Sequence, residues 1–216
     1  MSGSPGSGAG RHELAVILAR GDSRRMGRPK GLLNLPDSDE PLVGTIAELY
    51  HHRCPVVVVT LDSLAGAYEQ ALVGRDGVRV MGRPPGGETA LSVWWGWQGY
   101  ADKEQVTHVW AHPVDLPLVS PATLDLLLAQ SLVRPEALIR PVVNDGPGHP
   151  VVIPAGLLAE LTPGSRDLQG PFRDFIAGLQ ARNPGPPVIM VACEDRGTIM
   201  DFDTPGDLRS AVERKE

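Results

Sequence analysis

Two continuous apolar runs constrain the fold of this chain more than any other feature. They are LAVIL, from Leu14 to Leu18, and VVVVT, from Val56 to Thr60. Neither run alternates apolar with polar residues, which is typical of parallel strands that helices cover on both faces. The segment between them, EPLVGTIAELYHHR, carries Leu42, Ile46 and Leu49 at the spacing of an amphipathic helix. Together the three segments predict a strand, helix and parallel strand in succession.

The rest of the chain continues to alternate between the two kinds of element. Helices are expected in LDSLAGAYEQAL, ALSVWWGWQGYA, SPATLDLLLAQSL and GPFRDFIAGLQA, and strands in VRVM, VTHVWAH, ALIRPVV, HPVVIP and VIMVA. Ser120 followed by Pro121 is a typical helix start, and a last helix is expected after MDFDTPGDL. This alternation predicts an α/β fold, a three-layer sandwich with a Rossmann-like, mostly parallel sheet.

The length of the chain favours one domain. A single core can grow to about 250 residues before chains usually divide, and this chain has 216. We expect one domain over residues 12–216, preceded by a flexible lead over residues 1–11. That lead, MSGSPGSGAGR, lacks the apolar stretch of a signal peptide.

Charge, hydropathy and cysteine content exclude several classes of protein. A formal net charge of -6 argues against general nucleic-acid binding, which requires a broad basic surface. No apolar run approaches the roughly 20 residues of a membrane helix. Cys54 and Cys193 lie far apart in the sequence, which predicts reduced thiols in the core. We therefore expect a cytoplasmic protein that binds neither nucleic acid nor membrane.

A basic stretch follows the first predicted strand of this acidic chain. The sequence LARGDSRRMGRPKGLL contains five cationic side chains, Arg20, Arg24, Arg25, Arg28 and Lys30. Because like charges repel, their grouping indicates that an anion binds among them. Arginine can grip phosphate oxygens in a bidentate manner and lysine acts as a point charge, so the mixture suits a triphosphate.

This stretch is neither of the two commonest phosphate-binding loops. A P-loop requires lysine directly after its last glycine and then serine or threonine, whereas Arg28 and Pro29 follow Gly27. The dinucleotide-binding fingerprint requires three closely spaced glycines, whereas Gly21 and Gly27 stand alone. A solvated basic loop without a ligand is the alternative that the residues leave open.

Aspartates follow two of the later predicted elements. Asp115 comes just after VTHVWAH, at the carboxyl end of a strand, where open α/β sheets bind ligands. Asp203 ends IMDFD, and Asp201 shares its face if the segment is extended, with Phe202 pointing into the core. Magnesium is normally bound by one or two carboxylates together with phosphate oxygens. From the residues alone, Asp115 is equally consistent with a helix cap or a turn.

The stretch from Leu18 to Lys30, LARGDSRRMGRPK, resembles the signature of molybdenum-cofactor-type nucleotidyltransferases. That group includes molybdopterin cytidylyltransferases and molybdenum-cofactor guanylyltransferases. Its pattern is Leu-Ala-(Gly or Ala)-Gly-x-Ser-x-Arg-Met-Gly-x-x-Lys, and Arg20 is the one departure. HPVDLPLVSP, GHPVVIP and DFDTPGDL match in the expected order, so the resemblance covers nearly the whole chain. It implies the glycosyltransferase-A-like variant of the Rossmann-like sheet.

The resemblance also implies roles for individual residues. It assigns catalysis to Arg25 and Lys30, metal binding to Asp115 and Asp203, and acceptor binding to His149. It assigns nucleotide binding to Leu18, Ala19, Arg20, Gly21, Arg25, Lys30, Gly87 and Ser92. The match around Gly87 and Ser92 is loose, because GGETALSVWWG replaces the usual segment.

The implied reaction is attack by an acceptor phosphate on the α-phosphorus of a nucleoside triphosphate, with Mg²⁺ as cofactor and release of pyrophosphate. No general base is required, because a phosphate monoester has a second pKa of about 6 and is already largely dianionic. CTP is favoured over GTP, and molybdopterin is the leading acceptor. The alternatives are a sugar-phosphate, alcohol-phosphate or phosphonate nucleotidyltransferase, and a nucleotide-binding accessory protein without activity.

Arg20 lies by analogy beside the nucleobase. It is expected either to narrow the base pocket toward a pyrimidine or to grip a phosphate, the alternative being a side chain bent into solvent. At least two of the three clustered tryptophans, Trp94, Trp95 and Trp97, are expected in the core. His112 is expected to be a structural hydrogen-bond partner.

Overall fold

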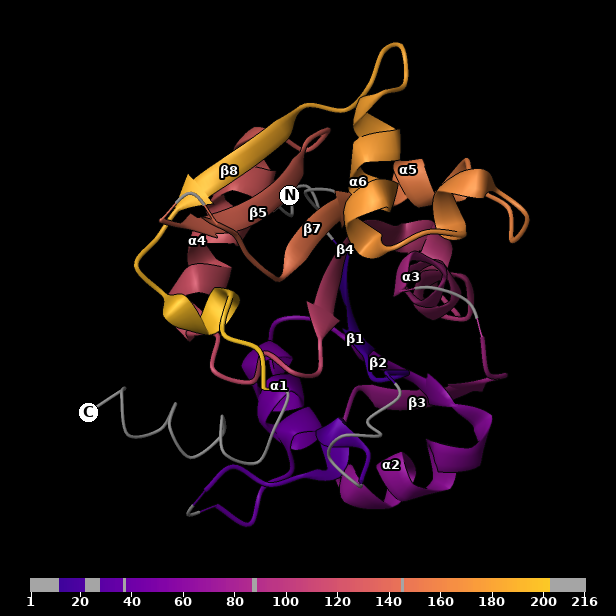
Figure 1. Ribbon diagram of the computed structural model, residues 1–216, viewed down its shortest axis with the longest axis vertical. Helices are drawn as coiled ribbons and strands as arrows, with labels where there is room; N and C mark the ends of the chain where they lie inside the picture. The colour runs from indigo at the N-terminus through magenta and orange to yellow at the C-terminus, as the bar shows by residue number, and fades with distance from the viewer. Residues whose placement is uncertain (1–11, 22–27, 37, 87–88, 145, 203–216) are drawn as a thin grey trace, which may run out of the picture.

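The computed structural model describes residues 12–21, 28–36, 38–86, 89–144 and 146–202. Within these residues the chain forms an eight-stranded sheet of order β3-β2-β1-β4-β7-β5-β6, with β8 paired to β5 (Figure 1). The strands are β1 (His12–Leu18), β2 (Val56–Leu61), β3 (Val78–Arg83), β4 (Val106–Pro113), β5 (Leu138–Val143), β6 (Gly146–Pro147), β7 (Val151–Pro154) and β8 (Val188–Ala192).

The sheet is mostly parallel, as the sequence predicts. Strand β1 pairs in parallel with β2 and β4, and the pairs β2–β3 and β5–β8 are also parallel. Strand β7 is antiparallel to β4 and β5. Only residues 144–150 connect β5 to β7, and a parallel crossover requires a dozen residues or more, so β7 must return in the opposite direction.

Helices cover both faces of this sheet. They are α1 (Leu42–Tyr50), α2 (Ala65–Ala71), α3 (Thr89–Gln98), α4 (Pro121–Val133), α5 (Ala155–Ala159) and α6 (Phe172–Gln180). Side chains of α1, α2 and α4 share one apolar cluster with the strands, and side chains of α3, α5 and α6 share another. Figure 1 shows the sheet between these two groups, which is the predicted three-layer sandwich.

The apolar run of β1 is buried because both faces are covered. Leu14, Ala15, Val16 and Ile17 have no exposed surface. Leu14 and Val16 belong to the cluster with α3, whereas Ala15 and Ile17 belong to the cluster with α1. Successive side chains of a strand point to opposite faces, so a strand between two helical layers requires apolar residues at every position.

The start of α4 is fixed as the sequence predicts and is tied to the end of the described chain. The hydroxyl of Ser120 accepts from the backbone N–H of Thr123 at 3.2 Å. The carboxylate of Asp195 accepts from the N–H of Ser120 and from the hydroxyl of Thr123, both at 2.7 Å. These bonds hold Asp195, and with it the segment that continues to Asp201, against the start of α4.

Two other predictions for individual side chains are confirmed. Phe202 is fully buried against Leu42, and both Trp94 and Trp97 are buried. Cys54 and Cys193 are free thiols, as predicted, but both are partly exposed, so the prediction that both lie in the core is wrong. The expected lead over residues 1–11 and the expected C-terminal helix lie outside the described residues. None of the described helices is long and apolar enough to cross a membrane.

Candidate active site

The carboxyl ends of β1 and β4 bring the described ends of the basic stretch, with Arg20 and Lys30, and Asp115 to one edge of the sheet. The two strands are parallel neighbours, and Leu18 at the end of β1 is in register with Pro113 at the end of β4. Asp115 follows β4 by two residues, and the basic stretch follows β1 directly. This edge is where open α/β sheets bind ligands.

Lys30 and Asp115 form an ion pair at this edge. The Nζ atom of Lys30 lies 3.4 Å from Oδ2 of Asp115, and the two side chains are 17% and 30% exposed. Burial raises the pKa of Asp115 and the Lys30 ammonium lowers it, while the neighbouring Asp201 carboxylate raises it further. A cation beside Asp115 would therefore stabilise its ionised form.

A glycine allows Lys30 to reach Asp115. Lys30 opens a short 3-10 helix, η2 (Lys30–Leu32). A Cβ atom on Gly31 would lie 2.7 Å from the hydroxyl of Tyr68 and 2.8 Å from Cγ2 of Val114. Only glycine fits between α2 and the residue before Asp115 without displacing these groups.

The Tyr68 side chain next to Gly31 is largely buried, and this burial raises its pKa to about 12. Tyr68 could not be predicted from the sequence, because nothing in its local pattern distinguishes it from a core residue.

The backbone of Leu18 and Ala19 shapes the end of β1. Both side chains are buried, and the carbonyl of Leu18 accepts from the N–H of Val114 at 3.2 Å. The N–H of Ala19 donates to Val59, and its carbonyl accepts from the hydroxyl of Thr60 at 3.2 Å. These bonds fix the position from which the next residues project toward the edge.

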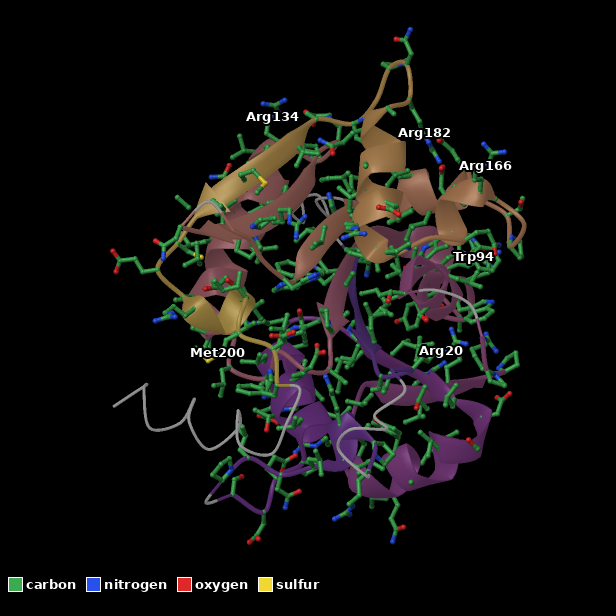
Figure 2. The ribbon with its side chains drawn as sticks, viewed as in Figure 1. Arg20, Trp94, Arg134, Arg166, Arg182 and Met200 are labelled. Carbon is green, nitrogen blue, oxygen red and sulfur yellow. The ribbon has the colours of Figure 1, made fainter. Side chains whose placement is uncertain are left out.

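The Arg20 side chain crosses to the segment between β3 and α3 (Figure 2). Its guanidinium donates to the carbonyl of Pro84 at 2.6 Å, to the carbonyl of Gly86, and to the hydroxyl of Ser92 at 3.1 Å. It also lies 4.7 Å from the ring centre of Trp95. The alternative of a side chain bent into solvent is therefore wrong. Ser92 lies in α3, and its buried hydroxyl accepts from Arg20.

His112 has the structural role that the sequence analysis expects. It is fully buried, and its Nε2 atom lies 3.0 Å from the carbonyl oxygen of Leu116. A carbonyl can only accept, so Nε2 carries the proton and Nδ1 accepts from the hydroxyl of Tyr50 at 3.0 Å. Burial lowers the pKa of His112 to about 4, which keeps the ring neutral at pH 7.

His149 lies at the same edge, on the side of the sheet that α6 covers. It precedes β7, whose first residue, Val151, is in register with Ala111 of β4. Its ring centre is 5.5 Å from that of Phe172. Burial lowers its pKa to about 3, and Nδ1 has no hydrogen-bond partner in the part of the chain that the structure describes.

These histidines predict how stability depends on pH. The pKa of His112 is lower in the folded chain than its ordinary value of about 6.5, so the unfolded chain binds more protons between these values. Through this difference His112 should contribute a fall of about 1 kcal/mol per pH unit in the free energy of unfolding as the pH drops from 6.5 to 4. Urea denaturation at several pH values measures this slope.

Matched variants assign that slope. His112→Gln should reduce it by about 1 kcal/mol per pH unit, whereas His51→Gln, at the exposed end of α1, should leave it unchanged. The slope that remains in His112→Gln is expected to come from His149, whose pKa is also lowered by burial. An unchanged slope in His112→Gln would contradict the assignment.

Three of the predicted site residues, Arg25, Gly87 and Asp203, lie outside the described residues. Gly21 is described, and a Cβ atom there would meet no atom of the other described residues within 4 Å. The described residues include no group of three or more His, Cys, Asp or Glu side chains arranged to hold a metal ion.

Comparison with solved structures places the fold among nucleotidyltransferases. The chain aligns over 94% of its length with 98% of Rv0371c from Mycobacterium tuberculosis, at 24% identity and a TM-score of 0.67, and Rv0371c is also known in complex with manganese. Molybdopterin-guanine dinucleotide biosynthesis protein A from Archaeoglobus fulgidus aligns over 94% of this chain and 98% of its own, at 17% identity and a TM-score of 0.65.

A third relative has a different acceptor in its name. It is 4-diphosphocytidyl-2C-methyl-D-erythritol synthase from Anaerococcus prevotii, which aligns over 95% of this chain and 99% of its own, at 14% identity and a TM-score of 0.64. No curated protein matches the chain. The model of the MobA-like NTP transferase domain matches residues 15–183, which is well over half of the sequence. The chain therefore belongs to the family of MobA-like NTP transferase domains.

Proposed function

We propose that this chain transfers a nucleoside monophosphate, most favourably from CTP, to a phosphorylated small molecule such as molybdopterin, with release of pyrophosphate. The observation that carries the proposal is the Lys30–Asp115 pair at the carboxyl ends of β1 and β4, with Asp201 beside it. A cation and partly buried carboxylates at this edge suit a triphosphate and its metal ion.

The protein's part in the reaction is alignment of two substrates and stabilisation of charge. An oxygen of the acceptor phosphate forms a bond to the α-phosphorus, and the bond from that phosphorus to the bridging oxygen of pyrophosphate breaks. Lys30 stabilises the negative charge that develops on the phosphates, with Arg25 as its partner by resemblance. No side chain needs to remove a proton, because the acceptor phosphate is already ionised.

The remaining site residues take the roles that the resemblance implies. Nucleotide binding is assigned to the end of β1 and to the start of α3, and acceptor binding to His149. The nucleotide-binding set is Leu18, Ala19, Arg20, Gly21, Arg25, Lys30, Gly87 and Ser92. The side chains of Leu18 and Ala19 are buried and their backbone is hydrogen-bonded to neighbouring strands and loops, so these two residues would contribute by fixing the end of β1.

A divalent cation fits the carboxylates of this site. Asp115 is desolvated and lies close to Asp201, so its ionised form benefits from a positive charge. Asp115 and Asp203 would hold Mg²⁺, which neutralises charge on the triphosphate when it is bound. The manganese complex of Rv0371c supports a divalent cation in this family.

The choice of CTP and molybdopterin rests on resemblance of RMGRPK and HPVDLPL to the cytidylyl branch. An alcohol phosphate is the second candidate acceptor, and the likeness to 4-diphosphocytidyl-2C-methyl-D-erythritol synthase favours it. We place the reaction in the cytoplasm, without nucleic acid or membrane as a partner.

Pyrophosphate release tests the proposal. The purified chain is incubated with CTP or GTP and Mg²⁺, with molybdopterin, an alcohol phosphate or a sugar phosphate as acceptor. Release is expected with CTP and one acceptor, and it should be abolished by EDTA. Nucleotide binding without release in every combination would favour the accessory protein instead.

A further inference from the structure

Arg20 joins three segments that are far apart in the sequence. It follows β1, and its hydrogen-bond partners are 64 to 72 residues away, in the segment Pro84–Gly86 and in α3. Strands β1, β2 and β3 run in parallel, so the end of β1 and the end of β3 lie at the same edge of the sheet. Arg20 therefore spans the edge at which the nucleotide is proposed to bind.

The segment that Arg20 holds has few hydrogen-bond donors of its own. Pro84 and Pro85 have no N–H, so neither can donate to a turn within the segment. Gly86 has a φ of +85°, a conformation that favours glycine. The carbonyls of Pro84 and Gly86 both accept from Nη2 of Arg20. Arg20, which follows β1, thus donates hydrogen bonds to this segment that the two prolines cannot donate.

The other contacts of Arg20 reach α3. Nη1 donates to the buried hydroxyl of Ser92, and the guanidinium lies against the ring of Trp95. Arg83 lies 5.8 Å from the same ring centre but makes none of these bonds to the segment or to Ser92. Burial lowers the pKa of Arg20, and the neighbouring Asp62 carboxylate opposes this effect. The side chain remains a cation, as arginine does in proteins.

We propose that Arg20 is a positioning residue that fixes the Pro84–Gly86 segment and Ser92 against the end of β1 and thereby sets which nucleobase this edge accepts. The inference rests on the proposed function, because a nucleobase is expected here only if a nucleoside triphosphate binds. Both Nη atoms of Arg20 donate to protein groups, namely two carbonyls and a hydroxyl, while its buried Nε atom has no hydrogen-bond partner among the described residues.

A segment held in one position would keep the distance across this edge fixed, and a fixed distance can exclude the larger purine ring. Released from Arg20, the segment can move outward and admit a purine. Lysine cannot replace arginine here, because one ammonium group lacks the planar fork that reaches both carbonyls and Ser92.

The test uses Arg20→Ala and Arg20→Lys, with Arg83→Ala as the matched control that removes the other cation beside Trp95. Hydrogen–deuterium exchange of the amides over residues 86–92 is measured without nucleotide. Affinities for CTP and GTP with Mg²⁺ are measured by calorimetry without acceptor. We expect faster exchange in both Arg20 variants, and a fall in the ratio of CTP to GTP affinity of about tenfold. Arg83→Ala should resemble the wild type in both measurements.

The outcomes test three separate claims, which are the positioning role, the link to nucleobase choice and the proposed function. Unchanged exchange in both Arg20 variants overturns the positioning role, and faster exchange with an unchanged affinity ratio overturns the link to nucleobase choice. A wild type that binds neither nucleotide overturns the proposed function itself, whatever the exchange shows. If Arg20→Ala does not fold, Arg20→Lys carries the same two measurements.

Discussion

Replacing Lys30 by alanine is expected to lower turnover at least about 100-fold, because loss of a preorganised charge typically costs about 3 to 4 kcal/mol of transition-state stabilisation. The folded structure should survive, since Lys30 lies in a short 3-10 helix outside the sheet and its side chain is not fully buried. Steady-state pyrophosphate release measures the effect, and thermal unfolding followed by circular dichroism measures the fold.

Lys103→Ala is the matched control for this change. Lys103 is the other lysine within the described residues, and its ammonium lies 3.8 Å from the exposed carboxylate of Glu104. Turnover should be unchanged in this variant. Near-normal turnover in Lys30→Ala would remove Lys30 from the reaction.

Asp115→Asn is expected to abolish metal-dependent activity while the melting temperature changes little. The amide keeps the shape of the carboxylate but loses the charge that a divalent cation requires. Stability should be retained, because a neutral amide avoids the desolvation that raises the pKa of Asp115. Activity is measured over a titration of Mg²⁺, and melting is measured without metal.

Asp125→Asn provides the control, since Asp125 is an exposed carboxylate on α4 that pairs with Arg53. It should alter neither activity nor its dependence on Mg²⁺. A large fall in melting temperature for Asp115→Asn would instead indicate that Asp115 has a structural role.

The layers of the fold could be predicted because burial on both faces of a strand leaves a local signal. The runs that form β1 and β2 are apolar at successive positions, and a sheet between two helical layers requires this. The start of α4 was also predictable, because Ser120 and Pro121 act within one turn. The pairing of β5 with β8 was not predictable, because no local pattern specifies which strand lies beside which.

Part of the candidate site could be predicted because apolar runs mark the strands that lead to it. Lys30 and Asp115 each follow an apolar run, and parallel neighbours bring such positions to one edge. The contacts of Arg20 could not be read from the sequence, because Pro84 and Ser92 lie 64 and 72 residues away. The close approach of Tyr68 to Gly31 likewise depends on how α2 packs.

Transfer of a label from the α-phosphate of CTP tests the central claim most directly. The purified chain is incubated with Mg²⁺, CTP labelled with ³²P at the α-position, and each candidate acceptor, and the products are separated. The account predicts that the label appears in a conjugate with one acceptor, in an amount equal to the pyrophosphate released, and that Lys30→Ala and Asp115→Asn suppress both. Label that stays in CTP with every acceptor, or that is released as free CMP at a rate independent of acceptor, would contradict it.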